Sequence, residues 1–131
     1  MGLVWANLDQ EAIRKATREL LSKQRPDGGW SDIDSMESGA YATGRSLYAL
    51  QIANFPASDA AYQRAVQYLL KTQLQDGSWY VRSRALALQP FFDAGFPHGF
   101  DQFISTAATN WATVALAQAG QSKTAIASRE R

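Results

Sequence analysis

Apolar residues recur at helical spacing in four stretches of this chain, and residues that favour turns separate the stretches. Helices are predicted over about 10–23, 38–53, 59–72 and 102–119. The predicted buried stripes of the first three helices are Ile13, Ala16 and Leu20; Leu47, Tyr48 and Leu50; and Tyr62, Val66, Leu69 and Leu70. Strand patterns are nearly absent, so the sequence predicts an all-α fold.

Polar and turn-forming residues mark the predicted helix ends. Asp9 can cap the first helix, with Leu8 and Ile13 placed to form a hydrophobic staple across that cap, and Ser58 can cap the third. The fourth helix is rich in alanine and is predicted to end at Gly120 as its C-cap. Residues 121–131 carry no apolar period, so we expect a frayed polar tail.

Two stretches of the chain repeat each other. They are KATRELLSKQRPDGGW, from Lys15, and RAVQYLLKTQLQDGSW, which begins 49 residues later at Arg64. The identical pairs are Ala16/Ala65, Leu20/Leu69, Leu21/Leu70, Gln24/Gln73, Asp27/Asp76, Gly28/Gly77 and Trp30/Trp79. A fixed period of this length is typical of repeat architectures. We predict two helix hairpins in one domain over 1–120, with repeat 1 at about 9–56 and repeat 2 at about 57–120.

Each repeat has a glutamine and a tryptophan around the turn that follows its first helix, Gln24 with Trp30 and Gln73 with Trp79. An amide can bond backbone groups left open at a helix end, while an indole can cover the turn. We interpret the four residues as structural, and a ligand role for the tryptophans is the alternative.

Composition excludes several functions. With thirteen basic and twelve acidic residues the formal net charge is +1, and the basic residues are spread along the chain, so nothing indicates a nucleic-acid partner. The absence of cysteine excludes disulfides, thiol catalysis and thiolate metal sites. The sequence has no signal-peptide pattern and no stretch of transmembrane length, so a cytoplasmic location is the default expectation.

The pattern Q-x-x-D-G-x-W after an A-x-x-x-L-L helix resembles the QW repeat of squalene-hopene cyclases and of the prenyltransferase/squalene oxidase repeat family. The second copy also resembles the C-terminal repeats of bacterial proteins described only as squalene-cyclase-like. The resemblance implies an α/α toroid, in which inner and outer helices alternate around a ring. In catalytic members of the family, the ring or its partner domain encloses an isoprenoid.

Catalytic members of the family carry an acidic Asp-x-Asp-Asp-Thr-Ala stretch at the start of an inner helix. When this stretch is aligned through the Ala-Leu pairs at 49–50 and 115–116, its acids fall on Gly39, Tyr41 and Ala42 in one copy and on Ser105, Ala107 and Ala108 in the other. Only the threonine is kept, as Thr43 and Thr109. No catalytic acid is therefore identified, and an active protein would be a squalene or terpene cyclase-like isomerase that takes its acid from another segment.

The sequence offers two further candidates, an acidic pair and a zinc site. Asp32 and Asp34 lie in the connecting loop, several residues before the acidic position, and are interpreted as a solvated, helix-capping segment. The related protein prenyltransferases bind zinc through Asp, Cys and His, and this chain lacks cysteine. We expect no metal and no cofactor.

The connection after Trp79 is the most distinctive segment. About 22 residues precede the next helix, and five of the six phenylalanines lie between positions 91 and 103. The candidate contacts for an apolar ligand are Phe91, Phe92, Phe96, Trp111 and Tyr48, and the candidate polar rim is Arg82, Arg84, Asp93, His98 and Asp101. In the alternative interpretation the phenylalanines cap the helix stack, Asp101 caps the fourth helix, and His98 bonds a backbone carbonyl.

Two functions remain open from the sequence. The first is a cyclase-like module that binds an isoprenoid or another apolar molecule, and the second is a structural module for protein–protein interaction or oligomerisation. Four helices cannot close a ring of about twelve, so the terminal hairpins should expose apolar faces. We therefore expect a homo-oligomer, with a trimer reaching the required helix number, or part of a larger polypeptide.

Overall fold

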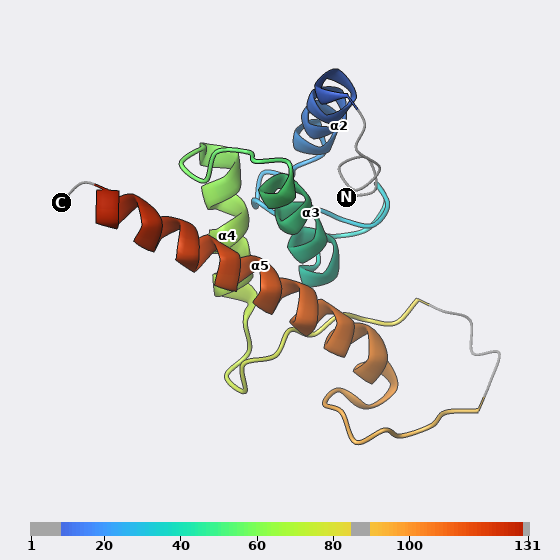
Figure 1. The fold of residues 1–131 in the computed structure, drawn as a ribbon. Helices are drawn as coiled ribbons and strands as arrows, with labels where there is room; N and C mark the ends of the chain where they lie inside the picture. The colour runs from blue at the N-terminus through green and yellow to red at the C-terminus, as the bar shows by residue number, and fades with distance from the viewer. Residues whose placement is uncertain (1–8, 85–89, 130–131) are drawn as a thin grey trace.

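The computed structural model describes residues 9–84 and 90–129, and within them the chain is helical (Figure 1). The helices are α2 (Gln10–Ser22), α3 (Ala40–Ile52), α4 (Ala60–Thr72), the short 3-10 helix η1 (Gly99–Asp101) and α5 (Gln102–Arg129). No strand occurs among the described residues. The predicted all-α fold is confirmed.

The predicted N-cap of α2 is confirmed, and the predicted N-cap of α4 is wrong. The Asp9 carboxylate caps α2 by accepting the backbone N–H groups of Glu11 and Ala12, as predicted. Helix α4 is capped by Asp59, which accepts the Ala61 N–H at 2.8 Å, so the prediction of Ser58 was wrong by one residue. The predicted staple residue Leu8 lies outside the described residues.

Helix α5 does not end where the sequence analysis placed its end. It continues through Gly120 to Arg129, so the predicted C-cap at Gly120 was wrong. No proline follows Gly120, and the positive φ angle that would mark a C-cap glycine is found among the described glycines only at Gly28, Gly77, Gly95 and Gly99. A single glycine weakens a helix without stopping it.

The centre of the protein is the contact between α3 and α5, which pack closely against each other. Gly44 makes this approach possible, because a Cβ at this position would lie 2.8 Å from the Ala112 backbone nitrogen. The Gln51 side-chain amide donates to the Ala115 carbonyl at 2.7 Å across the same contact. Ala112 and Ala115 are fully buried, so small residues set the distance between the two helices.

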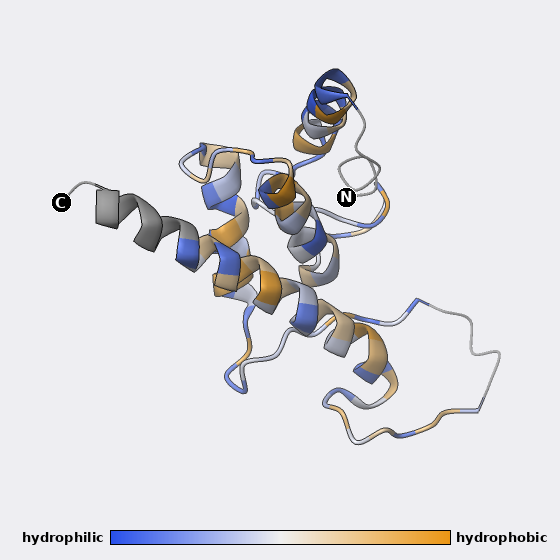
Figure 2. Ribbon diagram, viewed as in Figure 1, coloured by the Kyte–Doolittle hydropathy of each residue, from blue (hydrophilic) through white to orange (hydrophobic). Residues whose placement is uncertain are grey.

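Helix α4 packs against this pair through Tyr62 and Leu69, which are buried. Helix α2 has no buried residue, so its predicted stripe is only half-covered. The predicted burial of Leu70 was also wrong, because 50% of its surface is exposed. In Figure 2 the ribbon of α2 alternates between apolar and polar residues.

No helix in the described part of the chain is both long enough and apolar enough to span a membrane.

Candidate functional site

The turn after α2 is held by side-chain bonds from a glutamine and a tryptophan. The Gln24 amide donates to the Gly28 carbonyl at 3.0 Å, and the Trp30 indole N–H donates to the Leu20 carbonyl at 2.8 Å. The Trp30 backbone N–H donates to the Thr43 hydroxyl at 3.0 Å, which ties the turn to the first turn of α3. The indole is buried, so it covers the helix end while satisfying a carbonyl there.

The turn after α4 has the same geometry. Gln73 donates to the Gly77 carbonyl at 3.0 Å, and the Trp79 indole donates to the Leu69 carbonyl at 2.9 Å. The Trp79 N–H donates to the Thr109 hydroxyl at 3.0 Å. Gly28 and Gly77 have φ angles of +90° and +85°, which glycine adopts without steric cost. The two threonines thus occupy equivalent places, and α3 and α5 correspond to each other.

The positions aligned with the cyclase acids hold no acid, and two of them, Gly39 and Ser105, help to hold the backbone that leaves the turns. Gly39 is the N-cap residue of α3, and its N–H donates to the Trp30 carbonyl. In α5 the buried Ser105 hydroxyl accepts the Val81 N–H at 3.0 Å and donates to the Val81 carbonyl at 3.1 Å. The Ser105 hydroxyl therefore holds the backbone that leaves the second turn, and it is no acid that could protonate a substrate.

The two aspartates of the first connection differ in their surroundings. Asp34 has a side chain that is 94% exposed, with Lys23 at 3.8 Å. Asp32 forms an ion pair with Arg84 at 2.9 Å, and both side chains are about one-third exposed. Arg84 therefore links the connection after Trp79 to the connection after Trp30. Its guanidinium is bound to Asp32 and not available as part of the predicted polar rim.

The five phenylalanines of the second connection lie on the surface. Their exposed fractions are 47% for Phe91, 71% for Phe92, 47% for Phe96, 78% for Phe100 and 55% for Phe103. The rings of Phe91 and Phe100 pack against each other with their centres 4.3 Å apart. In Figure 2 the described residues 90–98 of this connection form an extended segment outside the helices. The alternative in which these rings cap the helix stack is wrong, because all five remain exposed.

A buried glutamine fixes part of this surface. Gln102, the first residue of α5, is fully buried, and its side chain accepts the Ala94 N–H at 2.8 Å and donates to the Phe92 carbonyl at 3.2 Å. Because both ends of one amide bind the backbone, residues 92–94 are held against the start of α5. From the sequence Gln102 is one of the polar residues beside the phenylalanines, and its bonds to the backbone are not predicted, since a single glutamine carries no pattern that indicates a distant backbone partner.

Asp101 links both arms of the connection and does not cap α5 with its side chain. Its carboxylate accepts the Tyr80 hydroxyl and the Ser83 N–H, each at 2.7 Å. The Ser83 bond, then the Tyr80 bond, lower the pKa of Asp101 below its usual value of 3.8, and the nearby charges of Arg82 and His98 act in the same direction. The bond to Asp101 in turn raises the pKa of Tyr80.

His98 binds a side chain and not a backbone carbonyl, so that alternative is wrong. Its Nε2 lies 2.9 Å from the Ser78 hydroxyl, which also lies 2.7 Å from the Asp76 carboxylate. The carboxylate therefore contacts the serine, whereas a catalytic triad needs it on the histidine. The bonds from Ser78 lower the pKa of Asp76. Asp93 accepts the Gly95 N–H at 2.8 Å. The rim residues are largely engaged in local bonds.

The other two predicted ligand residues lie between the central helices. The rings of Tyr48 on α3 and Trp111 on α5 are tilted with their centres 5.6 Å apart. The predicted ligand residues are thus divided between the α3–α5 contact and the exposed connection. The sequence could not reveal this division, because it depends on the path that the long connection takes before α5 begins.

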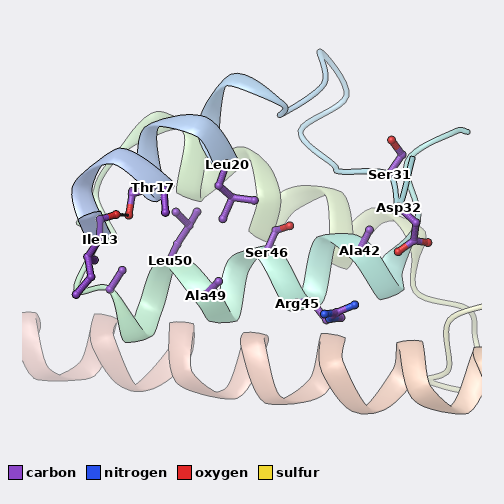
Figure 3. A pocket seen from close by; sticks show the side chains of 12 residues that line it. Ile13, Thr17, Leu20, Ser31, Asp32, Ala42, Arg45, Ser46, Ala49 and Leu50 are labelled. Carbon is purple, nitrogen blue, oxygen red and sulfur yellow. Dashed lines mark hydrogen bonds between the residues drawn. The ribbon is translucent and has the colours of Figure 1, made fainter. Parts of the chain in front are cut away.

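A pocket of about 400 Å³, which the sequence did not predict, lies between α2 and α3 (Figure 3). Apolar side chains from both helices form its walls, and Ser31, Asp32 and Arg45 add polar groups at one end. The other residues that line it are Ile13, Ala16, Thr17, Leu20, Ala42, Ser46, Ala49, Leu50 and Ala53. The pocket explains why α2 has no buried residue.

Comparison with known proteins gives partial similarities. Squalene–hopene cyclase of Zymomonas mobilis is 29% identical over 122 residues, which cover 92% of this chain and 17% of that protein. The similarity is to terpene cyclases. Lanosterol synthase of Candida albicans is 35% identical over 78 residues (52% of this chain, 11% of the synthase), and copalyl diphosphate synthase of Streptomyces anulatus is 42% identical over 62 residues (47% and 11%).

These similarities support a likeness of the chain to the terpene cyclase family and to a cyclase-like repeat region. It spans less than a fifth of the length of each of these three relatives. No protein-family model matches the chain, and no solved structure matches it significantly.

Proposed function

We propose that this chain is a pair of QW-type repeats from an α/α toroid of the terpene cyclase kind, which binds an apolar, isoprenoid-like ligand without supplying a protonating acid. The repeats would form one domain over residues 1–120. The observation that carries the proposal is the concentration of exposed phenylalanines between Phe91 and Phe103. Large exposed apolar patches are unfavourable in water and are typical of binding sites.

The surface is also ordered enough to bind. Gln102 holds the backbone of residues 92–94, and Asp101 holds that of Ser83 on the other arm. Because these segments are fixed before a ligand arrives, little ordering entropy is lost on binding. Phe92 and Phe100 have the largest exposed fractions, so they can contribute the most new burial. Trp111 and Tyr48 would then support the site from the α3–α5 contact.

Titration of the labelled chain with farnesol, followed by NMR, tests ligand binding. We expect shifts of the backbone amides between 91 and 103, and at least about tenfold weaker binding when Phe92→Ser and Phe100→Ser are combined, since each ring contributes roughly 1 kcal/mol or more on burial. Ile33→Ser is the matched control, because Ile33 is also an exposed apolar loop residue, 53% exposed. Absence of shifts in this segment up to the solubility limit of farnesol would contradict the proposal.

Turnover of squalene is a separate test of the missing acid. We expect no cyclised product from the chain alone, because no acid stands at the positions aligned with the catalytic acids of the cyclases. These positions hold Gly39, Tyr41, Ala42, Ser105, Ala107 and Ala108. A cyclised product would show that an acid elsewhere in the chain protonates the substrate.

The second candidate function is an interaction module with the polar rim as its partner surface. The rim offers few free groups for this role, since Asp101, His98 and Arg84 are bound within the chain. Oligomerisation is better supported by the exposed turn after α4 and the pocket between α2 and α3 than by the polar rim.

A further inference from the structure

The two turns have the same internal bonds but different coverage. The Gln24 amide also donates to the Ala61 carbonyl at 2.8 Å, and Arg64 donates to the Gln24 oxygen at 2.7 Å, so α4 covers the first turn. A Cβ on Gly28 would lie only 2.5 Å from the Arg64 carbonyl oxygen. Burial and the carboxylates of Asp27 and Glu37 raise the pKa of Tyr68, also on α4, to about 12.

The second turn has no such cover within the described residues. Gln73 keeps its bond to Gly77 and is exposed, and a Cβ on Gly77 would meet nothing nearer than the Gln73 amide nitrogen at 3.9 Å. Leu70 is 50% exposed, while its counterpart Leu21 packs partly against the core. The second turn therefore presents the surface that α4 covers in the first repeat.

The inner helices show the complementary difference. On α5, Ala108, Ala112, Ala115 and Ala119 are buried, and the neighbouring helix α3 packs closely against α5. Their counterparts on α3, aligned through the Ala-Leu pairs, are Ala42, Ser46, Ala49 and Ala53, and these four residues line the pocket between α2 and α3 (Figure 3). The pocket is thus the place where a preceding inner helix would lie in the repeat arrangement.

We propose that two copies of this chain associate head to tail, with the C-terminal face of one docked on the N-terminal face of the other. The C-terminal face consists of Gln73, Gly77, Asn110 and Val114, and the N-terminal face of Ala12, Lys15, Arg45 and Ser46. In this arrangement α5 of one copy enters the pocket of the next, as α3 packs on α5 within the chain. The inference does not depend on ligand binding by the phenylalanines.

The outer helices match in chemistry. By the repeat alignment, Ala12 stands where Ala61 stands and Lys15 where Arg64 stands. Gln73 of one copy can therefore donate to the Ala12 carbonyl of the next and accept from its Lys15, which reproduces both bonds that Gln24 makes to α4. Glu19 replaces Tyr68 and comes near Asp76 of the other copy, so added salt should strengthen the association by screening this repulsion.

The inner helices match as well. Val114, 42% exposed, corresponds to Tyr48, and Arg45 corresponds to its partner Trp111, so Val114 would pack on the aliphatic part of Arg45. Asn110 replaces Gly44 and comes opposite Ser46, a hydroxyl that can bond the amide. The helices would stand farther apart than α3 and α5 do, and the open pocket of about 400 Å³ provides the room.

A second copy is favoured as the occupant because the two faces, both open among the described residues, are related to each other by the repeat of this chain. An interface of this kind joins different surfaces, so association continues until a ring closes. Three copies would provide about the twelve helices of a closed ring.

Light scattering after size-exclusion chromatography, with complementary variants, tests the proposal. Ser46→Arg blocks the N-terminal face and Val114→Arg the C-terminal face, while Gln67→Arg on the exposed side of α4 is the control. We expect an oligomer for the unmodified chain and for the control, monomers for each blocked variant alone, and a dimer limited to one copy of each when the two are mixed. Monomeric unmodified chain at high concentration, or a monomeric mixture, would overturn the proposal.

Disulfide trapping gives a readout that does not depend on either arginine variant folding. The chain has no cysteine, so Lys15→Cys and Gln73→Cys chains can be mixed and oxidised without side reactions. We expect a mixed disulfide to form at least about tenfold faster than between Gln67→Cys and Gln73→Cys chains, because the proposed contact raises the effective concentration of the first pair. Equal rates for the two pairs would overturn the proposed contact.

Discussion

The turns that follow α2 and α4 share their internal bonds and differ in what lies outside them. Gln24 makes three hydrogen bonds, two of them to α4, whereas Gln73 makes the single bond to Gly77 among the described residues. Both tryptophans are buried to the same degree. The comparison separates two contributions in a repeat protein, the bonds that build a repeat and the contacts that join it to its neighbour.

Removing the tryptophans tests the shared part and should have the largest effect. Trp30→Ala and Trp79→Ala each delete a ring that is 2% exposed, together with its bond to a helix carbonyl. We expect each change to lower the free energy of unfolding by about 3–5 kcal/mol in urea denaturation. Ile33→Ala, at an exposed apolar position of the first connection, is the control, and a loss below about 1 kcal/mol for either tryptophan would show that the turns are not structural.

The turn glycines should separate the shared part from the neighbour contact. Gly77→Ala adds only the strain of a positive φ, about 1–2 kcal/mol. Gly28→Ala adds the same strain and a clash with the Arg64 carbonyl, so we expect a loss of about 3 kcal/mol or more. Thermal unfolding at low protein concentration measures both. Equal losses would mean that α4 does not press on the first turn in solution.

The glutamines should show a smaller difference in the same direction. Gln24→Ala removes an amide that bonds Gly28, Ala61 and Arg64, and we expect a loss of about 2 kcal/mol in urea denaturation, against at most about 0.5 kcal/mol for the exposed Gln73→Ala. If copies associate head to tail, the Gln73→Ala loss should grow with protein concentration. A loss for Gln73→Ala that equals that for Gln24→Ala in the monomer would contradict the comparison.

The sequence could predict the repeat and the helices because both depend on local pattern. Apolar spacing gives the position of α3, and Asp9 marks the start of α2 by a bond to its own first turn. The end of α5 was missed because a glycine ends a helix only when it adopts a positive φ angle, and Gly120 does not. The pocket beside α2 was missed because it depends on how α2 and α3 pack against each other, which no local pattern encodes. The Gln102 bonds were missed because they join positions without a common period.

The smallest expected effect concerns the longer second connection, which Asp101 holds and for which the first connection has no counterpart. Since the folded-state pKa of Asp101 lies below 3.8, its two bonds stabilise the connection above about pH 4, and this contribution disappears as the pH falls through the folded-state value. We expect the Ser83 amide and the Tyr80 ring signals to move together in NMR spectra between about pH 5 and pH 2. They should report a midpoint below 3.8.

Asp101→Asn is the matched variant, because it keeps an acceptor for the Ser83 N–H and removes the titrating group. Its Ser83 and Tyr80 signals should lose this pH dependence while the Trp79 signals stay unchanged, since the turn bonds to Leu69 and Thr109 involve no carboxylate. A midpoint at or above 3.8 in the unmodified chain would mean that Asp101 is not held by the two bonds. The second connection would then lack the bonds by which Asp101 holds Tyr80 and Ser83. The two repeats would then differ in the order of their connections as well as in the contacts that cover their turns.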